Sequence, residues 1–198
     1  ATREDRDVSE ALREVFEEDG IRVLTDAEAR AVEPREGGGI LLAVETADGE
    51  ERLEGSHLLV AVGRRPNSDG LGLEEAGVGT DDRGHVEVNG RLETSADGVW
   101  ALGDVTGRPP FTHTSYDDYR IVRDNLLHDA GRTDEDRILV YTVFTDPQLG
   151  RVGMTEDEAR EAGHDVRVAK LPMSRVARAI EMDETRGFMK AVVDGATD

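Results

Sequence analysis

A carboxylate placed directly after a glycine is the clearest chemical feature of this sequence. In ALGDVTGRPPFTHTSYDD (residues 101–118), Asp104 follows Gly103 at the expected end of an apolar strand, GVWAL (98–102). Glycine at a strand exit lets a ligand approach the backbone, because no Cβ stands in the way. An ionised carboxylate at that place suits the hydroxyl groups of a sugar or polyol as an acceptor. Asp104 is therefore a candidate ligand-binding residue.

A helix start follows this carboxylate. The sequence predicts a helix capped by Ser115, whose free N–H groups and partial positive charge favour an anionic or electron-rich ligand group near Thr112 and His113. A second glycine exit, Gly63, ends the apolar run HLLVAVG (57–63) before GRRPN. Ligands in open α/β sheets bind beyond the carboxyl ends of the strands, so both exits are candidate contacts.

Each of these features also has an ordinary structural explanation. A Gly-Asp pair after a strand can be a plain turn, His113 can be a packing residue, and GRRPN can be a surface turn. Asp117 and Asp118 point different ways on a helix, which favours compensation of the helix dipole over acid–base chemistry. The histidines show no metal-ligand spacing, so no metal site is predicted.

The apolar pattern predicts the elements that position these residues. Val8 to Phe16 form one face of a helix that an Asp7–Glu10 capping box begins and Gly20 ends. Asp48-Gly49 predicts a hairpin turn, and the EGGGIL segment is interpreted as a loop. Strands are expected at residues 21–24, 39–47, 51–56, 57–63, 85–88, 98–102, 138–144, 165–171 and 187–194.

The last third of the chain changes in character. Residues 131–137, GRTDEDR, are polar and are interpreted as a linker. Thr155 and Glu158 predict a second capping box on a short helix that ends at Gly163. In the helix after Ser115, three apolar residues are expected to share one side: Tyr119, Val122 and Leu126. The fold class is therefore α/β first and α+β afterwards.

Composition excludes several classes of function. The chain has 198 residues, 44 acidic and 24 basic, and a net charge of -20. This charge repels phosphates and anionic lipids, so neither nucleic acid nor a membrane is an expected partner. The acids are scattered, which favours a solvated acidic surface adapted to a salty, halophilic cytoplasm over an acidic docking face. With no cysteine, there is no disulfide and no thiolate nucleophile.

Four segments in order give the sequence a family resemblance. LLVAVGRRPN, TSADGVWALGDV, FTHTSYDDYRIV and VFTDPQLGRVGMTEDEAREAG together resemble the FAD-dependent pyridine nucleotide-disulfide oxidoreductases. The resemblance covers essentially the whole chain and is closest to the mercuric-reductase-like branch. It implies a partial fold of two dinucleotide-binding domains for FAD and NAD(P)H, followed by the start of an α+β dimerisation domain. The implied boundaries are residues 1–63, 64–131 and 132–198.

The resemblance also implies roles for individual residues. Thr94 to Asp104 match the second FAD motif of the family, in which the carboxylate after Gly103 accepts hydrogen bonds from the ribityl chain. Gly63 would lie near NAD(P)H. The flavin edge would be lined by four residues, Pro110, Phe111, Thr112 and His113. No residue of the chain is expected to be catalytic.

Several family features are missing from this sequence. Neither of the two glycine-rich phosphate loops is present, nor the Cys-x4-Cys redox pair, nor the His-x4-Glu pair. The sequence is therefore interpreted as an internal fragment. Its parent would be a homodimeric, cytoplasmic enzyme that passes a hydride from NAD(P)H through FAD to a disulfide or metal-ion acceptor.

Other functions stay open at this point. Within the family, the alternatives are a dihydrolipoamide dehydrogenase and a flavin transhydrogenase. Outside it, the chain could be a stand-alone, non-catalytic α/β binding module. An acidic interaction or metal-buffering protein is a further alternative that rests on charge alone.

Overall fold

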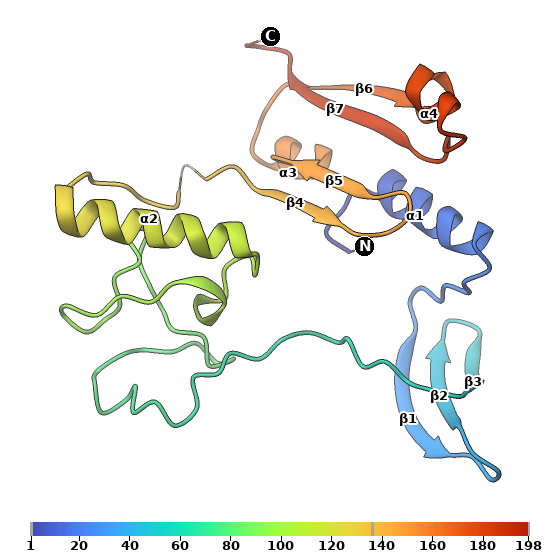
Figure 1. The fold of residues 1–198 in the computed structure, drawn as a ribbon, viewed down its shortest axis with the longest axis horizontal. Coiled ribbons are helices and arrows are strands. Elements are labelled where there is room, and N and C mark those ends of the chain that lie inside the picture. The colour runs from blue at the N-terminus through green and yellow to red at the C-terminus, as the bar shows by residue number, and fades with distance from the viewer. Residues whose placement is uncertain (1, 136, 198) are drawn as a thin grey trace. The chain divides into compact units, whose positions relative to one another are not determined.

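The computed structural model describes residues 2–135 and 137–197, and the chain divides into two compact units (Figure 1). The first unit comprises residues 1–60 and 142–198, and the second comprises residues 61–141. No helix in the described part of the chain is both long and apolar enough to cross a bilayer. In chain order the elements are α1 (Arg6–Glu18), β1 (Glu28–Pro34), β2 (Ile40–Thr46), β3 (Gly49–Gly55), η1 (Gly103–Thr106), α2 (Thr112–His128), β4 (Val140–Val143), β5 (Leu149–Val152), α3 (Glu156–Glu161), β6 (Val166–Pro172), η2 (Met173–Arg175), α4 (Ala177–Glu181) and β7 (Phe188–Asp194).

Strands β1, β2 and β3 form an antiparallel sheet in the first unit. The predicted hairpin is confirmed, since Thr46 pairs with Gly49 at the end of β2 and β3. The triple glycine at 37–39 forms the turn between β1 and β2, as its interpretation as a loop required. The strand expected at residues 21–24 is wrong, because nothing in the described structure pairs with this short segment. Its Arg22 instead donates to the Glu51 carboxylate on β3, at 2.8 Å for one of the two hydrogen bonds.

Helix α1 has the predicted apolar face, and Val15 on that face is buried. Its end near Gly20 is also confirmed, because this glycine has a φ of 79° and the Ile21 N–H returns to the Phe16 carbonyl at 2.8 Å. The predicted Asp7–Glu10 capping box is wrong. The N-cap residue is Asp5, so Asp7 lies inside the first turn.

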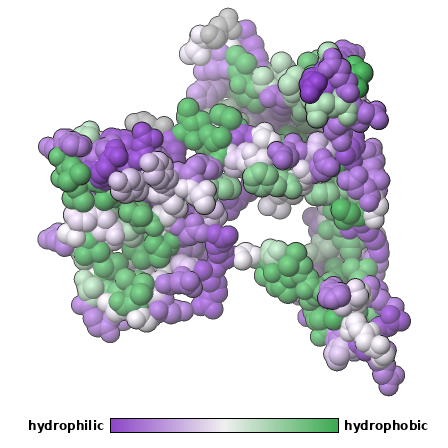
Figure 2. All heavy atoms as spheres, viewed as in Figure 1, coloured by the Kyte–Doolittle hydropathy of each residue, from purple (hydrophilic) through white to green (hydrophobic). Residues whose placement is uncertain are grey.

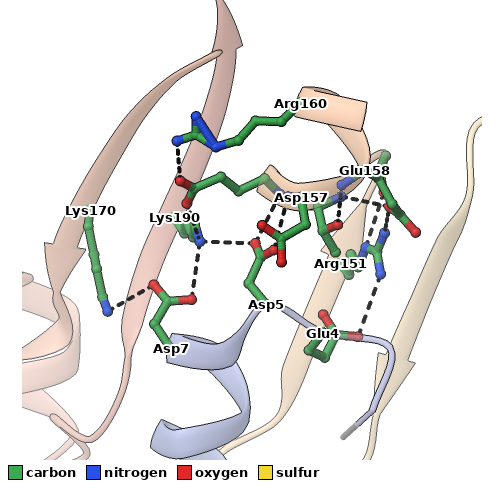
Figure 3. A network of polar contacts seen from close by, with 12 residues as sticks. Glu4, Asp5, Asp7, Arg151, Asp157, Glu158, Arg160, Lys170 and Lys190 are labelled. Carbon is green, nitrogen blue, oxygen red and sulfur yellow. Dashed lines mark hydrogen bonds and ion pairs between the residues drawn. The ribbon is translucent and has the colours of Figure 1, made fainter. Parts of the chain in front are cut away.

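Asp7 instead neutralises the only two lysines of the chain, Lys170 and Lys190. These two lysines lie directly opposite each other on β6 and β7. Like charges in such a cross-strand pair repel. The Asp7 carboxylate accepts a hydrogen bond from each ammonium group at 3.1 Å, and this arrangement is visible in Figure 3. The acid therefore fastens the start of α1 to the sheet of β6 and β7.

Asp5 connects the same network to helix α3. Its carboxylate accepts the backbone N–H groups of Glu156 and Asp157 at 3.0 and 3.3 Å, and the Lys190 ammonium at 2.9 Å (Figure 3). The side chains of Asp5 and Lys190 are each only 10% exposed. An acid at a helix N-terminus satisfies N–H groups that lack partners within the helix. Asp5 thus caps a helix more than 150 residues away along the chain.

The elements predicted for the last part of the chain are confirmed. The Thr155–Glu158 capping box is present, with Thr155 Oγ1 accepting the Glu158 N–H at 3.0 Å and the Glu158 carboxylate accepting the Thr155 N–H at 2.8 Å. Strands β4, β6 and β7 occupy the expected segments. β4 pairs with β5, and β6 pairs with β7.

Three strands expected around the second unit do not form. Residues 57–63 are in no strand, and their apolar side chains include Leu59 at 88% and Val62 at 93% exposure. An apolar run becomes a strand only when other strands satisfy its backbone and other elements cover its faces; none of the described residues do so. The segments 85–88 and 98–102 contribute only isolated bridges. Figure 2 shows hydrophobic residues exposed beside hydrophilic ones on the visible face.

Helix α2 begins earlier than predicted, because its N-cap residue is Phe111 rather than Ser115. Its buried residues are Thr114, Asp118 and Ile121. Tyr119, Val122 and Leu126 share one side of α2, as their spacing requires, but this side is not buried, since Tyr119 and Leu126 are 46% and 55% exposed. The helix is turned so that a carboxylate, rather than these apolar side chains, enters the interior of the second unit.

The network around Lys190 predicts a large effect of one substitution on stability. We expect Lys190→Met to lower the free energy of unfolding of the chain by about 2 kcal/mol, because it removes the cation that Asp5, Asp7 and Glu156 share in a buried setting. Urea unfolding followed by circular dichroism measures this change. The matched control is Arg178→Met, because Arg178 pairs with Glu181 on the surface and is expected to change stability by no more than about 0.5 kcal/mol.

The stability of the wild type and that of Lys190→Met should respond differently to acid. Burial opposes ionisation of Asp5 and Asp7, but hydrogen bonds, including those from Lys190, hold the pKa of each below its ordinary 3.8. Their stabilising contribution is present above that pKa and is lost as the pH falls through the lower, folded-state pKa. The stability difference between wild type and Lys190→Met should therefore shrink below about pH 4. A difference that stays constant down to about pH 2 would contradict this assignment.

Candidate functional site

The turn that carries Asp104 requires glycine at the preceding position. Gly103 has a φ of 75°, in the left-handed region that side chains other than glycine rarely adopt. A Cβ added there would lie 2.9 Å from Ser115 Oγ on α2. Thr106 closes the turn by donating its hydroxyl to the Gly103 carbonyl at 2.8 Å. The turn η1 and the first part of α2 are thus in close contact through Gly103.

A buried carboxylate holds this turn in place. Asp118 on α2 is fully buried and accepts the Gly103 backbone N–H at 2.8 Å through Oδ2. Its other oxygen accepts from the guanidinium of Arg137, which also donates to Asp117 at 3.0 Å. Burial works against the charge of Arg137, but the two aspartates outweigh it and raise its pKa. The interpretation of Asp117 and Asp118 as dipole compensation is wrong, because neither lies in the first turn and both serve as ion-pair partners.

The segment expected to be a linker is tied down by similar pairs. Arg132 donates to Asp117 and Asp124, and Asp134 accepts from the Arg108 guanidinium. Residue 136 of this segment lies outside the described residues. The part that is described, residues 131–135 and 137, is therefore fastened to α2 and to the loop after η1.

The Asp104 side chain lies at the surface and has one partner among the described residues. Its Oδ2 accepts a hydrogen bond from Nη1 of Arg64, 40 residues earlier in the chain. The side chains of Arg64 and Asp104 are 70% and 40% exposed. Within the described residues, Oδ1 of Asp104 has no recorded donor. The prediction that this carboxylate binds polyol hydroxyls thus stays a prediction, and Arg64 is a neighbour that sequence analysis did not anticipate.

The start of α2 presents the other candidate residues. The N-cap residue is Phe111, whose side chain has no acceptor for the N–H groups of the first turn, to which Thr112 and His113 belong. The His113 Nε2 is 2.8 Å from the Val140 carbonyl, and since a carbonyl can only accept, Nε2 carries the proton. Phe111 stacks on the His113 ring with centroids 5.3 Å apart, and on the Tyr141 ring at 5.6 Å. These rings form an ordered aromatic wall beside the helix N-terminus.

The remaining candidates, Pro110 and Gly63, are less closely connected to the rest of the site. Pro110 lies between Pro109 and Phe111, whose N–H donates to the Pro109 carbonyl at 2.9 Å. Gly63 has a φ of 132° and open space where a Cβ would be. Its neighbour Arg64 contacts Asp104.

Sequence analysis missed three residues of this site, Arg64, Asp118 and Arg137. A signal for Asp118 existed, since a second acid beside Asp117 on a helix with few buried apolar residues is a candidate for a buried role. Arg64 and Arg137 carried no local signal. Their partners lie far away along the chain, and arginine is frequent in this sequence.

Within the described residues, neither a group of metal ligands nor the cavity of the first unit coincides with this site. In the described part of the chain, no three His, Cys, Asp or Glu residues are grouped so that they could hold a metal ion. A cavity of about 850 Å³ lies in the first unit, lined mainly by α1, β5 and β7. None of the candidate residues lines it.

Two family models and several known proteins match this chain. Residues 2–118 match the family model described as pyridine nucleotide-disulphide oxidoreductase, and residues 139–198 match the dimerisation domain of the same family. The chain is 42% identical to the probable pyridine nucleotide-disulfide oxidoreductase RclA of Escherichia coli, over 98% of this chain and 43% of that protein. It is 39% identical to a mercuric reductase of Streptomyces lividans, over 100% of this chain and 41% of that protein.

A further relative and one solved structure are also similar to this chain. A dihydrolipoyl dehydrogenase of Thermus scotoductus is 39% identical over 98% of this chain and 42% of its own length. The solved HOCl-induced flavoprotein disulfide reductase RclA from Escherichia coli superimposes with a TM-score of 0.88, over 99% of this chain and 44% of that chain. The chain thus spans less than half the length of each of these relatives.

The buried contact at Gly103 predicts the effect of changing Asp118. Asp118→Ala should lower the free energy of unfolding of the second unit by about 3 kcal/mol, because it leaves the Arg137 guanidinium and the Gly103 N–H without their buried acceptor. Asp118→Asn, which keeps one acceptor oxygen, should cost less. Hydrogen exchange of the Gly103 amide gives a second measurement, with protection lost in Asp118→Ala. The control Asp129→Asn changes an exposed acid at the end of α2 and should leave both measurements unchanged.

A pair of glycine substitutions separates backbone strain from crowding. Gly98 and Gly103 have similar φ angles of 76° and 75°, but only Gly103 has an atom close to its added Cβ. Gly98→Ala should therefore cost about 1 kcal/mol of stability, from strain alone. Gly103→Ala should cost more, and Ser115→Ala in the same protein should recover part of the excess. Equal losses for the two single variants in denaturant unfolding would show that Ser115 does not crowd this turn.

Proposed function

This chain belongs to the pyridine nucleotide-disulphide oxidoreductase family, and from that premise we propose that it is part of a flavoprotein oxidoreductase. Its whole protein would pass a hydride from NAD(P)H through FAD to a disulfide or metal-ion acceptor. The family predicted from the sequence is confirmed by the family models, and the fold class by the structural match.

One observation carries this proposal. The solved structure that this chain matches at a TM-score of 0.88 is described as a flavoprotein disulfide reductase, and the match covers 99% of the chain. The agreement therefore includes the turn at Gly103 and the start of α2. At 42% identity, this similarity supports a shared function as well as a shared fold.

The geometry of the candidate site fits a flavin cofactor. Gly103 allows the close contact between η1 and α2 that sets the turn, and Asp104 keeps one carboxylate oxygen for a ribityl hydroxyl. The first turn of α2 offers N–H groups and a partial positive charge for an electron-rich ring edge, beside Phe111 and His113. When bound, FAD supplies the two-electron carrier chemistry. The residues of this chain bind the cofactor, orient it and form the wall beside it.

The nature of the acceptor separates the candidate enzymes. Mercuric reductase and dihydrolipoyl dehydrogenase relatives show the same identity of 39%, so both activities are candidates, and a flavin transhydrogenase is a third. The chain has no cysteine, so a redox-active dithiol would come from a part of the protein outside these residues. No catalytic residue is proposed within the chain.

The oligomeric state, the location, the salt adaptation and the domain boundaries of the whole protein are also proposals. The match of residues 139–198 to a dimerisation domain supports a homodimer. We also propose a cytoplasmic location, and the net charge of -20 supports adaptation to high salt. The proposed domains are residues 1–63 for part of the NAD(P)H domain, 64–131 for the end of the FAD domain, and 132–198 for the start of the dimerisation domain.

The experiment that tests this function uses the full reading frame that encodes the chain. The purified protein should be yellow, with flavin absorbance near ~450 nm, and NADH or NADPH should bleach it. Asp104→Ala should weaken FAD binding by about ten- to a hundredfold, since a hydrogen bond to a charged group contributes about 1.5–3 kcal/mol. Asp129→Asn, at the exposed end of α2, should bind FAD normally.

The outcome can also favour another function. A colourless protein that takes up no added FAD would contradict the proposal and favour a non-catalytic binding module. If FAD is bound, assays with Hg²⁺, with a dihydrolipoyl substrate and with the second pyridine nucleotide as acceptors distinguish the three candidate activities.

A further inference from the structure

The contact between Arg64 and Asp104 joins the segment after Gly63, which the family resemblance places near NAD(P)H, to the carboxylate that it places on the ribityl chain of FAD. Arg64 follows Gly63, and its Nη1 donates to Oδ2 of Asp104. The segment around Arg64 is anchored further along the chain, because Ser68 donates its hydroxyl to the Gly84 carbonyl at 2.6 Å. The guanidinium therefore comes from an anchored loop, not from a free end.

The ion pair between Arg64 and Asp104 leaves one oxygen of the carboxylate available to a ligand. A carboxylate has two oxygens that together accept up to about four hydrogen bonds, and only Oδ2 of Asp104 has a recorded donor among the described residues. Oδ1 can accept a ligand hydroxyl while the arginine stays in place. The backbone that carries this carboxylate is also fixed, because the adjacent Gly103 N–H is bonded to the buried Asp118.

Other cations near the site are not placed to do the same. Arg65 lies 3.9 Å from Asp69, in a pair whose side chains are 89% and 94% exposed. Arg108 is engaged with Asp134 and with the Asn89 carbonyl. Among the described residues, Arg64 is thus the arginine that donates to the Asp104 carboxylate.

We propose that Arg64 is a positioning residue for the cofactor: it holds Oδ2 of Asp104 so that Oδ1 faces a hydroxyl of the flavin ribityl chain. This inference rests on the proposed function. Arg64 acts through Asp104 and without itself contacting the ribityl chain. An unassisted carboxylate at this exposed turn would rotate freely, and fixing one oxygen lowers the entropy lost when the other binds a ligand.

The test measures FAD affinity in the full-length protein, with five variants. The dissociation constant of FAD is obtained by titrating the flavin-free protein and following flavin fluorescence. Arg64→Ala should raise it about fivefold, the largest effect expected when an exposed ion pair is lost. Arg64→Lys should restore part of the affinity. Arg65→Ala is the matched control and should bind FAD like the wild type.

A double variant shows whether the effect passes through Asp104. In the Asp104→Asn protein, adding Arg64→Ala should change FAD affinity by less than twofold, because the carboxylate that Arg64 holds is already absent. Thermal unfolding of each flavin-free variant shows whether it is folded. The exposed Arg64 is not expected to alter that transition.

Each alternative outcome has a distinct meaning. Unchanged affinity in Arg64→Ala would overturn the inference, and tighter binding would show that the arginine competes with FAD for Asp104. An equal loss in the Asp104→Asn background would show that Arg64 acts elsewhere. FAD uptake by the wild type with any of these results leaves the proposed function standing. No FAD uptake by the wild type would overturn the proposed function and this inference together.

Discussion

The fully buried Asp118 carboxylate is the constraint on which the candidate site depends. It accepts the Gly103 N–H with one oxygen and the Arg137 guanidinium with the other, so it joins η1, α2 and the segment after α2. An ionised group in the interior is tolerated only when it is paired and hydrogen-bonded. The pairing therefore fixes the rotation of α2, and with it the direction in which the helix presents its N-terminus and the place where Asp104 reaches the surface.

In the first unit, too, carboxylates join elements that are distant in the sequence. Asp5 caps α3 from a distant part of the chain, and Asp7 separates two lysines that would otherwise repel each other across β6 and β7. In both units, buried acids satisfy backbone N–H groups and arginine or lysine side chains. Much of the acidic excess of this sequence lies at the surface, but these few carboxylates decide how its helices and strands are held together. A net charge cannot distinguish the two kinds of acid.

Local patterns were sufficient for much of the fold. The hairpin at Asp48-Gly49 and the Thr155–Glu158 capping box depend on neighbours within a few residues, and the strands β4, β6 and β7 form in the apolar segments where they were expected. Predictions that needed distant partners were less successful. The apolar run at 57–63 has the composition of a buried strand, yet no described segment pairs with it. The Asp7–Glu10 box had the right residue types, but Asp7 found stronger partners in Lys170 and Lys190.

The sequence alone determined the family, the place of the Gly103–Asp104 turn and the helix that follows it, because these are set by residue types at short spacing. The tertiary structure decided which groups surround them. Arg64 lies 40 residues from Asp104 and Arg137 lies 19 residues from Asp118, and neither contact follows from periodicity or turn chemistry. Ion pairs of this kind depend on where folding brings two long side chains. A chain with so many acids and arginines offers many such pairs, and only its three-dimensional structure selects among them.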